Sequence, residues 1–185
     1  EMNPWWKVVL DTSMGPAQPV NEVFLEGGYT VKEVKITLTG GPRVLSLAEV
    51  QLFAPMEPTQ PQIFGGTASQ SSTYGKIDLG SIFSSPGFVA SRAIDGNFDT
   101  KWNGDSVSST NNELNPWWKV VLDTEEIVES ILVYNRGDSC CHSRLDNAII
   151  ELFDGDGKSV YVRSMGPAQP VNEVFLESGY TVKEV

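Results

Sequence analysis

The sequence is poor in basic residues, in cysteine and in histidine, and it has no long apolar run. Its 13 Lys and Arg residues stand against 24 Asp and Glu residues, which gives a formal net charge of −11. The basic residues form no stripe along which phosphates could bind, so we do not expect nucleic acid as a partner. No apolar segment approaches the roughly 20 residues that a bilayer-spanning helix needs, so we expect no membrane insertion.

Motifs of catalysis are also missing. The chain has no Ser/His/Asp arrangement, no zinc-binding pattern and no phosphate-binding loop. The nearby carboxylates Glu125, Glu126 and Glu129 resemble the solvated end of a strand more than a general acid and base. We therefore predict that the protein is not an enzyme.

The loop between residues 134 and 145 concentrates the unusual side chains. Both cysteines, the only histidine, two arginines and an aspartate lie there, between apolar segments that predict strands. A polar loop carried by strands is a usual place for binding residues, although a well-capped surface turn has the same composition. The adjacent Cys140 and Cys141 could form a small disulfide ring in an oxidising compartment or stay as two thiols in a reducing one.

Two segments of the sequence occur twice. Residues 3–12 recur unchanged as residues 115–124, and residues 13–34 recur as residues 164–185 with one difference, Gly27 against Ser178. The stretch 125–163 occurs only in the second copy. Such identity indicates recent tandem duplication.

We interpret the chain as a window cut from an array with a period of 151 residues. Residues 1–54 are then the C-terminal part of a preceding repeat whose middle is missing between Thr12 and Ser13. Residues 55–66, with three prolines, form a stiff extended linker. Residues 67–185 form a domain without its last strands, which we expect a neighbouring unit to supply from its equivalent of residues 35–53.

Short apolar and β-branched runs predict an all-β fold. They are bounded by Gly and Pro and show no helical period of useful length. The segment Asp154-Gly155-Asp156-Gly157 has the composition of a hairpin turn. Many short strands with regularly spaced turns predict a β-sandwich. The predicted strands cover residues 5–10, 20–25, 30–39, 44–53, 117–122, 127–134, 148–153, 160–162, 171–176 and 181–185.

Four motifs resemble the discoidin or coagulation-factor C-type superfamily, and among its branches the F-type lectins (fucolectins). The motifs are Ala93-Ile94-Asp95-Gly96-Asn97 with Trp102, residues 115–123, Asn135-Arg136-Gly137-Asp138 with Cys140-Cys141 and Arg144-Leu145, and residues 47–53. The resemblance covers about one whole domain if residues 35–53 are placed after Val185. It implies an eight-stranded jelly-roll sandwich, which the array interpretation repeats in tandem.

The resemblance also implies a sugar site built from a histidine, two arginines and the face of a vicinal disulfide. Arg144 matches the second arginine if Ser139 is an inserted residue, and the position of the histidine holds Ser109. Forked guanidinium groups can hold sugar oxygens, while the disulfide offers an apolar platform. The implied carbohydrate-binding residues are Arg136, Asp138, Cys140, Cys141, His142, Arg144 and Ser109.

A structural calcium ion is a further implication of the resemblance. Its ligands would come from the backbone of Arg92 and from Asp95, Asn97, Ser106 and Glu49. The residue types agree in part, because an Asp-Gly-Asn turn brings oxygens together and Ca²⁺ takes about six to eight oxygen ligands. An Asx turn without a metal has the same sequence.

Two hypotheses of function follow. The first is a non-enzymatic extracellular repeat protein, in which lectin-like sandwiches build a head-to-tail filament or adhesive cell-surface polymer with copies of itself as partners and weak residual glycan binding. The near-identical copies and the missing histidine favour it. The alternative is a fucose- or galactose-binding F-type lectin module of a secreted or cell-surface protein. Both hypotheses place the protein outside the cell or on its surface.

Overall fold

The structure, a computed structural model, describes residues 20–54, 65–78, 84–138, 140–168 and 172–174. These residues form strands and short 3-10 helices, with no α-helix among them. No helix in the described part of the chain has the length and apolar character that a membrane span requires. The strands are β1 Val20–Thr37, β2 Ser46–Phe53, β3 Gly66–Gln70, β4 Ile77–Asp78, β5 Ser84–Ser85, β6 Ser108–Ser109, β7 Trp117–Asn135, β8 Ile149–Phe153, β9 Ser159–Ser164 and β10 Asn172–Val174; the helices are η1 Ala90–Ile94, η2 Trp102–Gly104 and η3 His142–Leu145.

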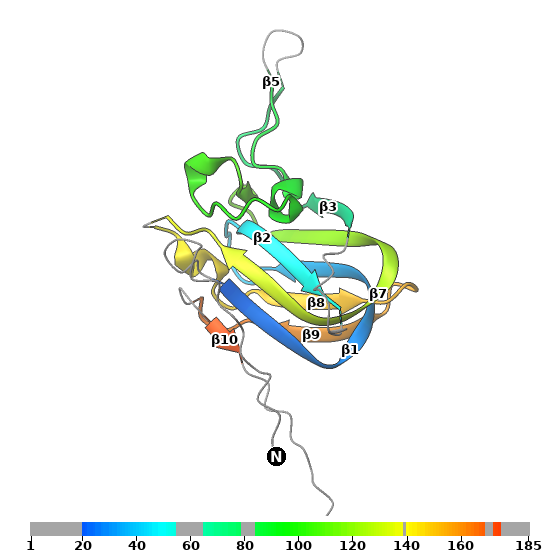
Figure 1. The fold of residues 1–185 in the computed structure, drawn as a ribbon. Helices are drawn as coiled ribbons and strands as arrows, with labels where there is room; N and C mark the ends of the chain where they lie inside the picture. Colours follow the sequence, from blue (N-terminus) through cyan, green and yellow to red (C-terminus); the bar gives the residue numbers. More distant parts are fainter. Residues whose placement is uncertain (1–19, 55–64, 79–83, 139, 169–171, 175–185) are drawn as a thin grey trace, which may run out of the picture.

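An antiparallel ribbon of the two longest strands, β1 and β7, forms the frame of the molecule. The ribbon runs from the pair Val20–Tyr134 to the pair Thr37–Trp117, with register shifts between Phe24 and Tyr29 and between Val31 and Glu33. Such irregularities bend a strand and increase its twist. Figure 1 shows both strands curving around one side of the molecule, so that each contributes to two layers.

The two halves of the ribbon carry different neighbours. In one layer, the first part of β7 pairs with β3, and the last part of β1 pairs with β8, which in turn pairs with β9. In the other layer, the last part of β7 pairs with β2, which pairs with β6. The main sheet has eight strands, of which six follow the order β6-β2-β7-β1-β8-β9, while β3 pairs with β7 and β10 pairs with β1 beside this path. The predicted all-β, eight-stranded sandwich is therefore confirmed.

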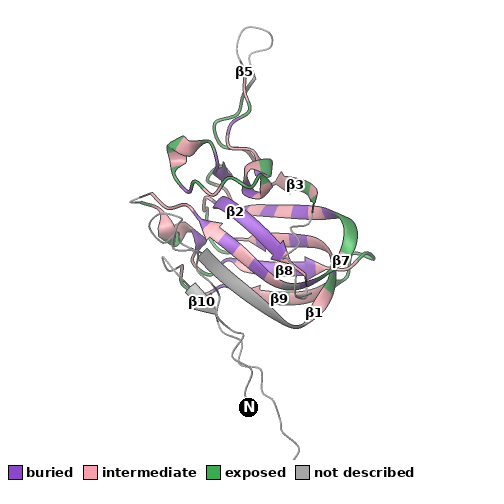
Figure 2. Cartoon of the chain, viewed as in Figure 1, coloured by how far each residue is buried: buried purple, intermediate pink, exposed green. Residues whose placement is uncertain are grey.

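The core lies between these layers and follows the strand alternation. Along β8, Ile150 and Leu152 are buried while their neighbours are partly exposed. Trp118 and Leu122 of β7 are also nearly fully buried, and the Trp118 indole N–H donates to the Ala90 carbonyl. Figure 2 shows the buried residues concentrated on β2, β7 and β8. Burial of this apolar face is the main term that stabilises the sandwich.

The structure differs from the predicted strand limits by joining two pairs of segments. The predicted strands 20–25 and 30–39 belong to the single strand β1, Val20–Thr37. The segments 117–122 and 127–134 belong to the single strand β7, although Glu125 and Glu126 between them indicated a break. The backbone continues because Thr30 and Val31 of β1 pair with Ile127 and Glu126. The turn at residues 154–157 lies between β8 and β9 as predicted, with the Gly157 N–H donating to the Asp154 carbonyl.

The distribution of strands also differs from the expected division into two repeats. β1 and β2, which we assigned to a preceding unit, pair with β7 of the same chain. Their apolar residues Val34, Ile36 and Leu47 are completely buried in the shared core. Residues on both sides of the linker therefore contribute strands to one sandwich in this structure. The division of the sequence into repeats stays a prediction.

Several sequence predictions fall outside the described residues. They are the strand 5–10, the junction of Thr12 and Ser13, the linker residues 55–64 and the strand 181–185. Tandem repetition and strand exchange between neighbouring units stay predictions.

Candidate functional site

The loop that joins β7 to β8 is tied down at its base by Asn135. The Asn135 side-chain amide donates to the His142 carbonyl at 2.9 Å, and its oxygen accepts the backbone N–H of Arg136 at 2.8 Å. Cys140 and Cys141 are joined by a disulfide, and Cys141 precedes η3 in the left-handed region at φ 76°. The loop thus presents an apolar disulfide face together with Arg136, which follows β7 directly, and Arg144, which lies on η3.

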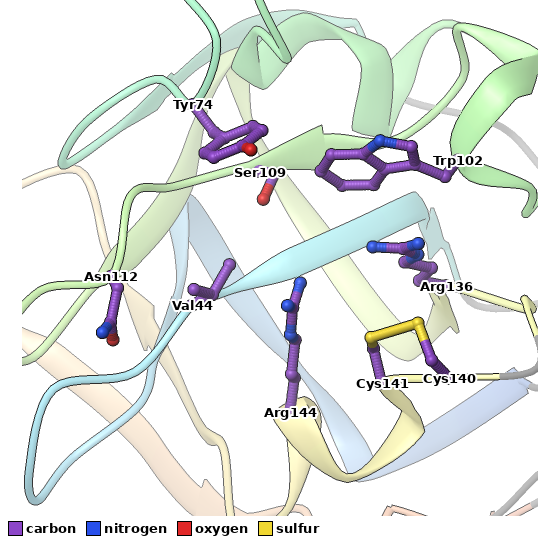
Figure 3. Close-up of a pocket in the computed structure, with 9 residues that line it drawn as sticks. All are labelled: Val44, Tyr74, Trp102, Ser109, Asn112, Arg136, Cys140, Cys141 and Arg144. Atoms are coloured by element: carbon purple, nitrogen blue, oxygen red, sulfur yellow. A yellow bond between two sulfur atoms is a disulfide. The ribbon is translucent and has the colours of Figure 1, made fainter.

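A cavity of about 360 Å³ opens beside this disulfide. Figure 3 shows Arg144 extending into it from η3, with Arg136 above the two sulfur atoms and Trp102 and Tyr74 on the opposite wall. The size is that of a small-ligand site, in which aromatic and apolar walls surround a few polar groups. The lining residues are Val44, Tyr74, Trp102, Ser109, Asn112, Arg136, Cys140, Cys141 and Arg144.

Arg136 is held in a defined orientation. Its Nε lies 2.5 Å from Asp138 Oδ2, and its guanidinium lies 4.1 Å from the centroid of the Trp102 ring. Both Asp138 oxygens also accept the backbone N–H of Trp102 at 3.1 Å. Asp138 therefore joins the Arg136 loop to η2 and acts on the cavity by positioning, since it is not one of the lining residues.

The Trp102 ring is itself supported from behind. It stacks on Phe88 with 3.9 Å between ring centroids, and the Arg92 guanidinium lies 5.1 Å from the Phe88 ring. The centroid of the Tyr74 ring lies 5.6 Å from that of Trp102 and 5.8 Å from that of Phe88. Aromatic and cation–π contacts of this kind each contribute about 1 kcal/mol. The aromatic wall is therefore preorganised.

Arg144 enters the cavity from η3, which is held in place by Arg43. One guanidinium nitrogen of Arg43, Nη2, donates to the carbonyls of Arg144 and Asp146 at 3.0 and 2.6 Å. Burial lowers the pKa of Arg144, and the nearby positive charge of Arg136 lowers it further. The guanidinium groups of Arg136 and Arg144 thus face the same cavity, where their positive charges repel each other.

Ser109, at the position of the family histidine, lines the cavity, and its hydroxyl is engaged in hydrogen bonds within the protein. The side chain is completely buried, its hydroxyl donates to the Thr110 carbonyl, and it lies 3.2 Å from the hydroxyl of Ser46. His142 does not line the cavity, and its Nε2 is buried without a hydrogen-bond partner in the described structure. Of the seven predicted residues, five line the cavity, Asp138 positions Arg136, and His142 is not among the lining residues.

A second cluster joins part of the predicted calcium ligands. The Gly96 N–H donates to Glu49 Oε1 at 3.2 Å, and Asp95 Oδ1 accepts the Asn97 N–H at 2.8 Å. Glu49 is 2 % exposed, and burial raises the pKa of its carboxyl to about 7, with the Asp95 charge contributing. The arrangement places Glu49 on β2 beside the Asp-Gly-Asn turn within one sandwich. The array interpretation places Glu49 and Asp95 in different repeats unless the fold is completed across the linker or by a neighbouring chain, and in this structure both lie in the same chain.

The remaining two predicted ligands are placed differently. Ser106 is completely buried, and its hydroxyl has no hydrogen-bond partner among the described residues. The Arg92 side chain pairs with Asp105 at 3.1 Å. No group of three or more His, Cys, Asp and Glu side chains suited to a metal occurs in the described ranges. Any cation here would therefore depend on backbone and hydroxyl oxygens as well as on carboxylates.

Four lining residues were absent from the predicted site. Trp102 was part of a motif, and its place seven residues after Asp95 was the one signal that could have identified it. Val44, Tyr74 and Asn112 come from segments of ordinary composition that only the folded topology brings together.

Comparisons with known proteins agree with this geometry. The family model of the NedA-like, galactose-binding domain matches residues 92–185, so the chain belongs to this family. The resemblance to the F-type lectin branch of the discoidin superfamily is confirmed. No solved structure matches the chain significantly.

Individual relatives point to the same branch. The chain is 41 % identical over 85 residues to Fucolectin-1 of Anguilla japonica, covering 46 % of this chain and 44 % of the relative. It is 35 % identical over 112 residues to Fucolectin-5 of the same species, covering 58 % and 56 %. A Pentraxin fusion protein of Xenopus laevis is 30 % identical over 87 residues, covering 47 % and 18 %. The chain thus spans about half the length of the fucolectins it matches.

Proposed function

We propose that the protein is a lectin-like module that binds a saccharide in the cavity beside the Cys140–Cys141 disulfide and catalyses no reaction. The observation that carries this proposal is that both arginines and the disulfide line one cavity. The names of the fucolectin relatives support fucose as the sugar, and the description of the family model supports galactose.

The residues have complementary roles in this proposal. The Arg136 and Arg144 guanidinium groups donate to ring and hydroxyl oxygens, because a guanidinium offers a planar fork of donors and no acceptor. The disulfide and the Trp102 ring contact the apolar face of the sugar. Asp138 keeps Arg136 oriented before the ligand arrives, which reduces the entropy cost of binding.

Calorimetric titration with fucose, galactose and galacturonate tests the proposal. We expect saturable binding with a dissociation constant on the order of 1 mM for a free monosaccharide, equivalent to about −4 kcal/mol. The double variant C140S/C141S should weaken binding severalfold, while Val162→Ala on the exposed face of β9 should not. If none of the three sugars, neutral or acidic, binds the natural sequence, the proposal is wrong.

We also propose that a calcium ion stabilises the turn beside Glu49. Support comes from two buried oxygens without hydrogen-bond partners in the described residues, Glu49 Oε2 and Ser106 Oγ, which suit a hard cation. Calcium at a hundred times its dissociation constant should add about 2.7 kcal/mol of stability. Differential scanning calorimetry with Ca²⁺ and with EDTA should show this rise in the natural sequence and not in Glu49→Gln. Equal melting temperatures with and without Ca²⁺ would exclude the ion.

The filament hypothesis has one specific observation in its favour. Residues 20–34 of β1 recur, with one difference, as residues 171–185. A segment of matching sequence could enter the position of β1 in another chain, which is how exchanged strands build polymers. Negative-stain electron microscopy distinguishes the hypotheses, because regular fibres are expected of the polymer and discrete particles of a single lectin module.

An extracellular or cell-surface location belongs to the same proposal. Its support is the Cys140–Cys141 disulfide, since disulfides persist mainly in oxidising compartments. Mass spectrometry of protein isolated with thiols blocked should find this bond intact.

A further inference from the structure

The cavity contains cationic donors and no carboxylate. None of its nine lining residues is Asp or Glu. Arg136 has a counter-charge in Asp138 at 2.5 Å, outside the lining set. Arg144 has no acidic partner within the described residues, where the ion pairs are Arg92–Asp105, Lys119–Glu33 and Arg136–Asp138. The cavity thus has one uncompensated positive charge in a chain of net charge −11.

The hydrogen bonds that hold η3 do not use the Arg144 guanidinium. Arg43 contacts the Arg144 carbonyl, and the Arg144 backbone N–H donates to the Cys141 carbonyl at 3.1 Å. The helix is therefore positioned independently of the charged head group. Figure 3 shows that head group directed into the open cavity, which leaves it available to a ligand.

Besides the two guanidinium groups, the cavity wall offers two neutral groups that can accept from a sugar hydroxyl, the Asn112 amide oxygen and the Tyr74 hydroxyl. The hydroxyl of Ser109 is engaged with Ser46 and Thr110. A guanidinium only donates, whereas a neutral sugar hydroxyl needs a partner for its own proton as well. A ligand group that only accepts hydrogen bonds and carries negative charge therefore matches the guanidinium groups of Arg136 and Arg144 better than a hydroxyl does.

We propose that the cavity prefers saccharides that carry an oxyanion, a carboxylate or a sulfate ester, which Arg144 binds with help from Arg136. The proposal rests on saccharide binding in this cavity and specifies its class of ligand. A charge-assisted hydrogen bond to an oxyanion is about twice as strong as one to a neutral hydroxyl. An exposed anion elsewhere on this acidic surface would instead be repelled.

Matched ligands test the proposal. Calorimetric titration compares methyl galactoside with methyl galacturonoside, which differs by a carboxylate at C6, and with methyl galactoside 6-sulfate. We expect at least one of the two anionic sugars to bind about tenfold more tightly than the neutral one at low salt, a difference of about 1.4 kcal/mol. The comparison of the two anions identifies the carboxylate or the sulfate as the better group. Higher salt should reduce the advantage and leave the neutral sugar nearly unaffected.

Variants connect the preference to Arg144. Arg144→Gln should bring the ratio of the affinities for the anionic and the neutral sugar close to one. Arg144→Lys should keep part of the preference for the anionic sugar, and Lys158→Gln in the exposed β8–β9 turn should keep all of it. Circular dichroism verifies that each variant is folded.

Three outcomes separate this inference from the proposed function. If the neutral sugar binds as tightly as both anions, the preference is wrong and saccharide binding stands. If Arg144→Gln keeps the ratio, the role of Arg144 is wrong. If no sugar binds, both proposals are overturned.

Discussion

Arg136 illustrates how the site is organised at the scale of single residues. Its guanidinium lies between the Trp102 ring and the Asp138 carboxylate, and its backbone N–H is bound by Asn135. Arg136, the two cysteines and Arg144 were predicted as sugar-binding residues because their motif resembles that of the F-type lectins. The Trp102 contact was not, because the aromatic side chain comes from η2, more than 30 residues earlier in the chain.

The first prediction concerns Asp138. Replacing it by Asn removes the ion pair that orients Arg136, so the affinity for methyl galactoside should fall about fivefold, equivalent to roughly 1 kcal/mol. Calorimetric titration measures the change. Asp105→Asn is the matched control, because it breaks the Arg92 ion pair outside the cavity. Equal affinities of Asp138→Asn and the natural sequence would show that Arg136 needs no such support.

Glu49 gives a prediction about pH. Its carboxyl is buried, and this raises its pKa from 4.5 to about 7. The folded protein therefore keeps a proton that the unfolded chain releases, so stability is highest below about pH 4.5 and declines up to about pH 7. The free energy of unfolding should decrease by roughly 3 kcal/mol over this pH range.

In EDTA, the melting temperature of the natural sequence should thus fall between pH 5 and pH 8. Glu49→Gln should remove most of this decline, whereas Asp156→Asn in the exposed turn should keep it. A natural sequence whose melting temperature is constant over this range would show that Glu49 is not held in a desolvated position.

At the scale of elements, η3 depends on a segment that precedes the linker. Arg43 lies between β1 and β2, yet its Nη2 donates to two η3-region carbonyls, and its backbone pairs with Glu113. Sequence patterns predicted the strands on both sides of Arg43 and the loop before η3. They could not predict the contact between them, because it depends on the register of β2 against β7.

Arg43→Ala should therefore loosen η3 and weaken sugar binding. We expect the affinity to fall about tenfold and the free energy of unfolding to fall by about 2 kcal/mol, because two carbonyls lose a charged donor. Titration calorimetry and thermal unfolding measure the two effects. Lys32→Ala is the control, since Lys32 also donates to a backbone carbonyl, that of Asp123, in an exposed position. If affinity stays unchanged while stability falls, Arg43 serves the fold alone.

At the scale of the whole molecule, the duplicated segment gives two candidates for one strand. β1 occupies the position between β7 and β8 in this structure, and Val31 is completely buried there. Residues 20–34 recur with one difference at residues 171–185, where Val182 corresponds to Val31. The sandwich class was predictable from strand spacing and motifs. The choice of copy was not, since identical sequences have identical preferences.

Substitution of one copy at a time identifies the strand in use. Val31→Asp places a charge in the core and should lower the free energy of unfolding by more than about 3 kcal/mol, while Val182→Asp should change it little. Denaturant unfolding of both variants measures this. The reverse order would indicate that the second copy fills the position, and a large loss only in the double variant would indicate that either copy can.

The stack of Phe88, Trp102 and Arg136 has a practical consequence for spectroscopy. An indole that forms the wall of a cavity, with a guanidinium 4.1 Å from its face, senses any change in local polarity when solvent beside it is replaced. Its fluorescence emission is therefore a built-in optical signal of occupancy, and a Trp102→Phe variant would identify the part of the signal that arises there.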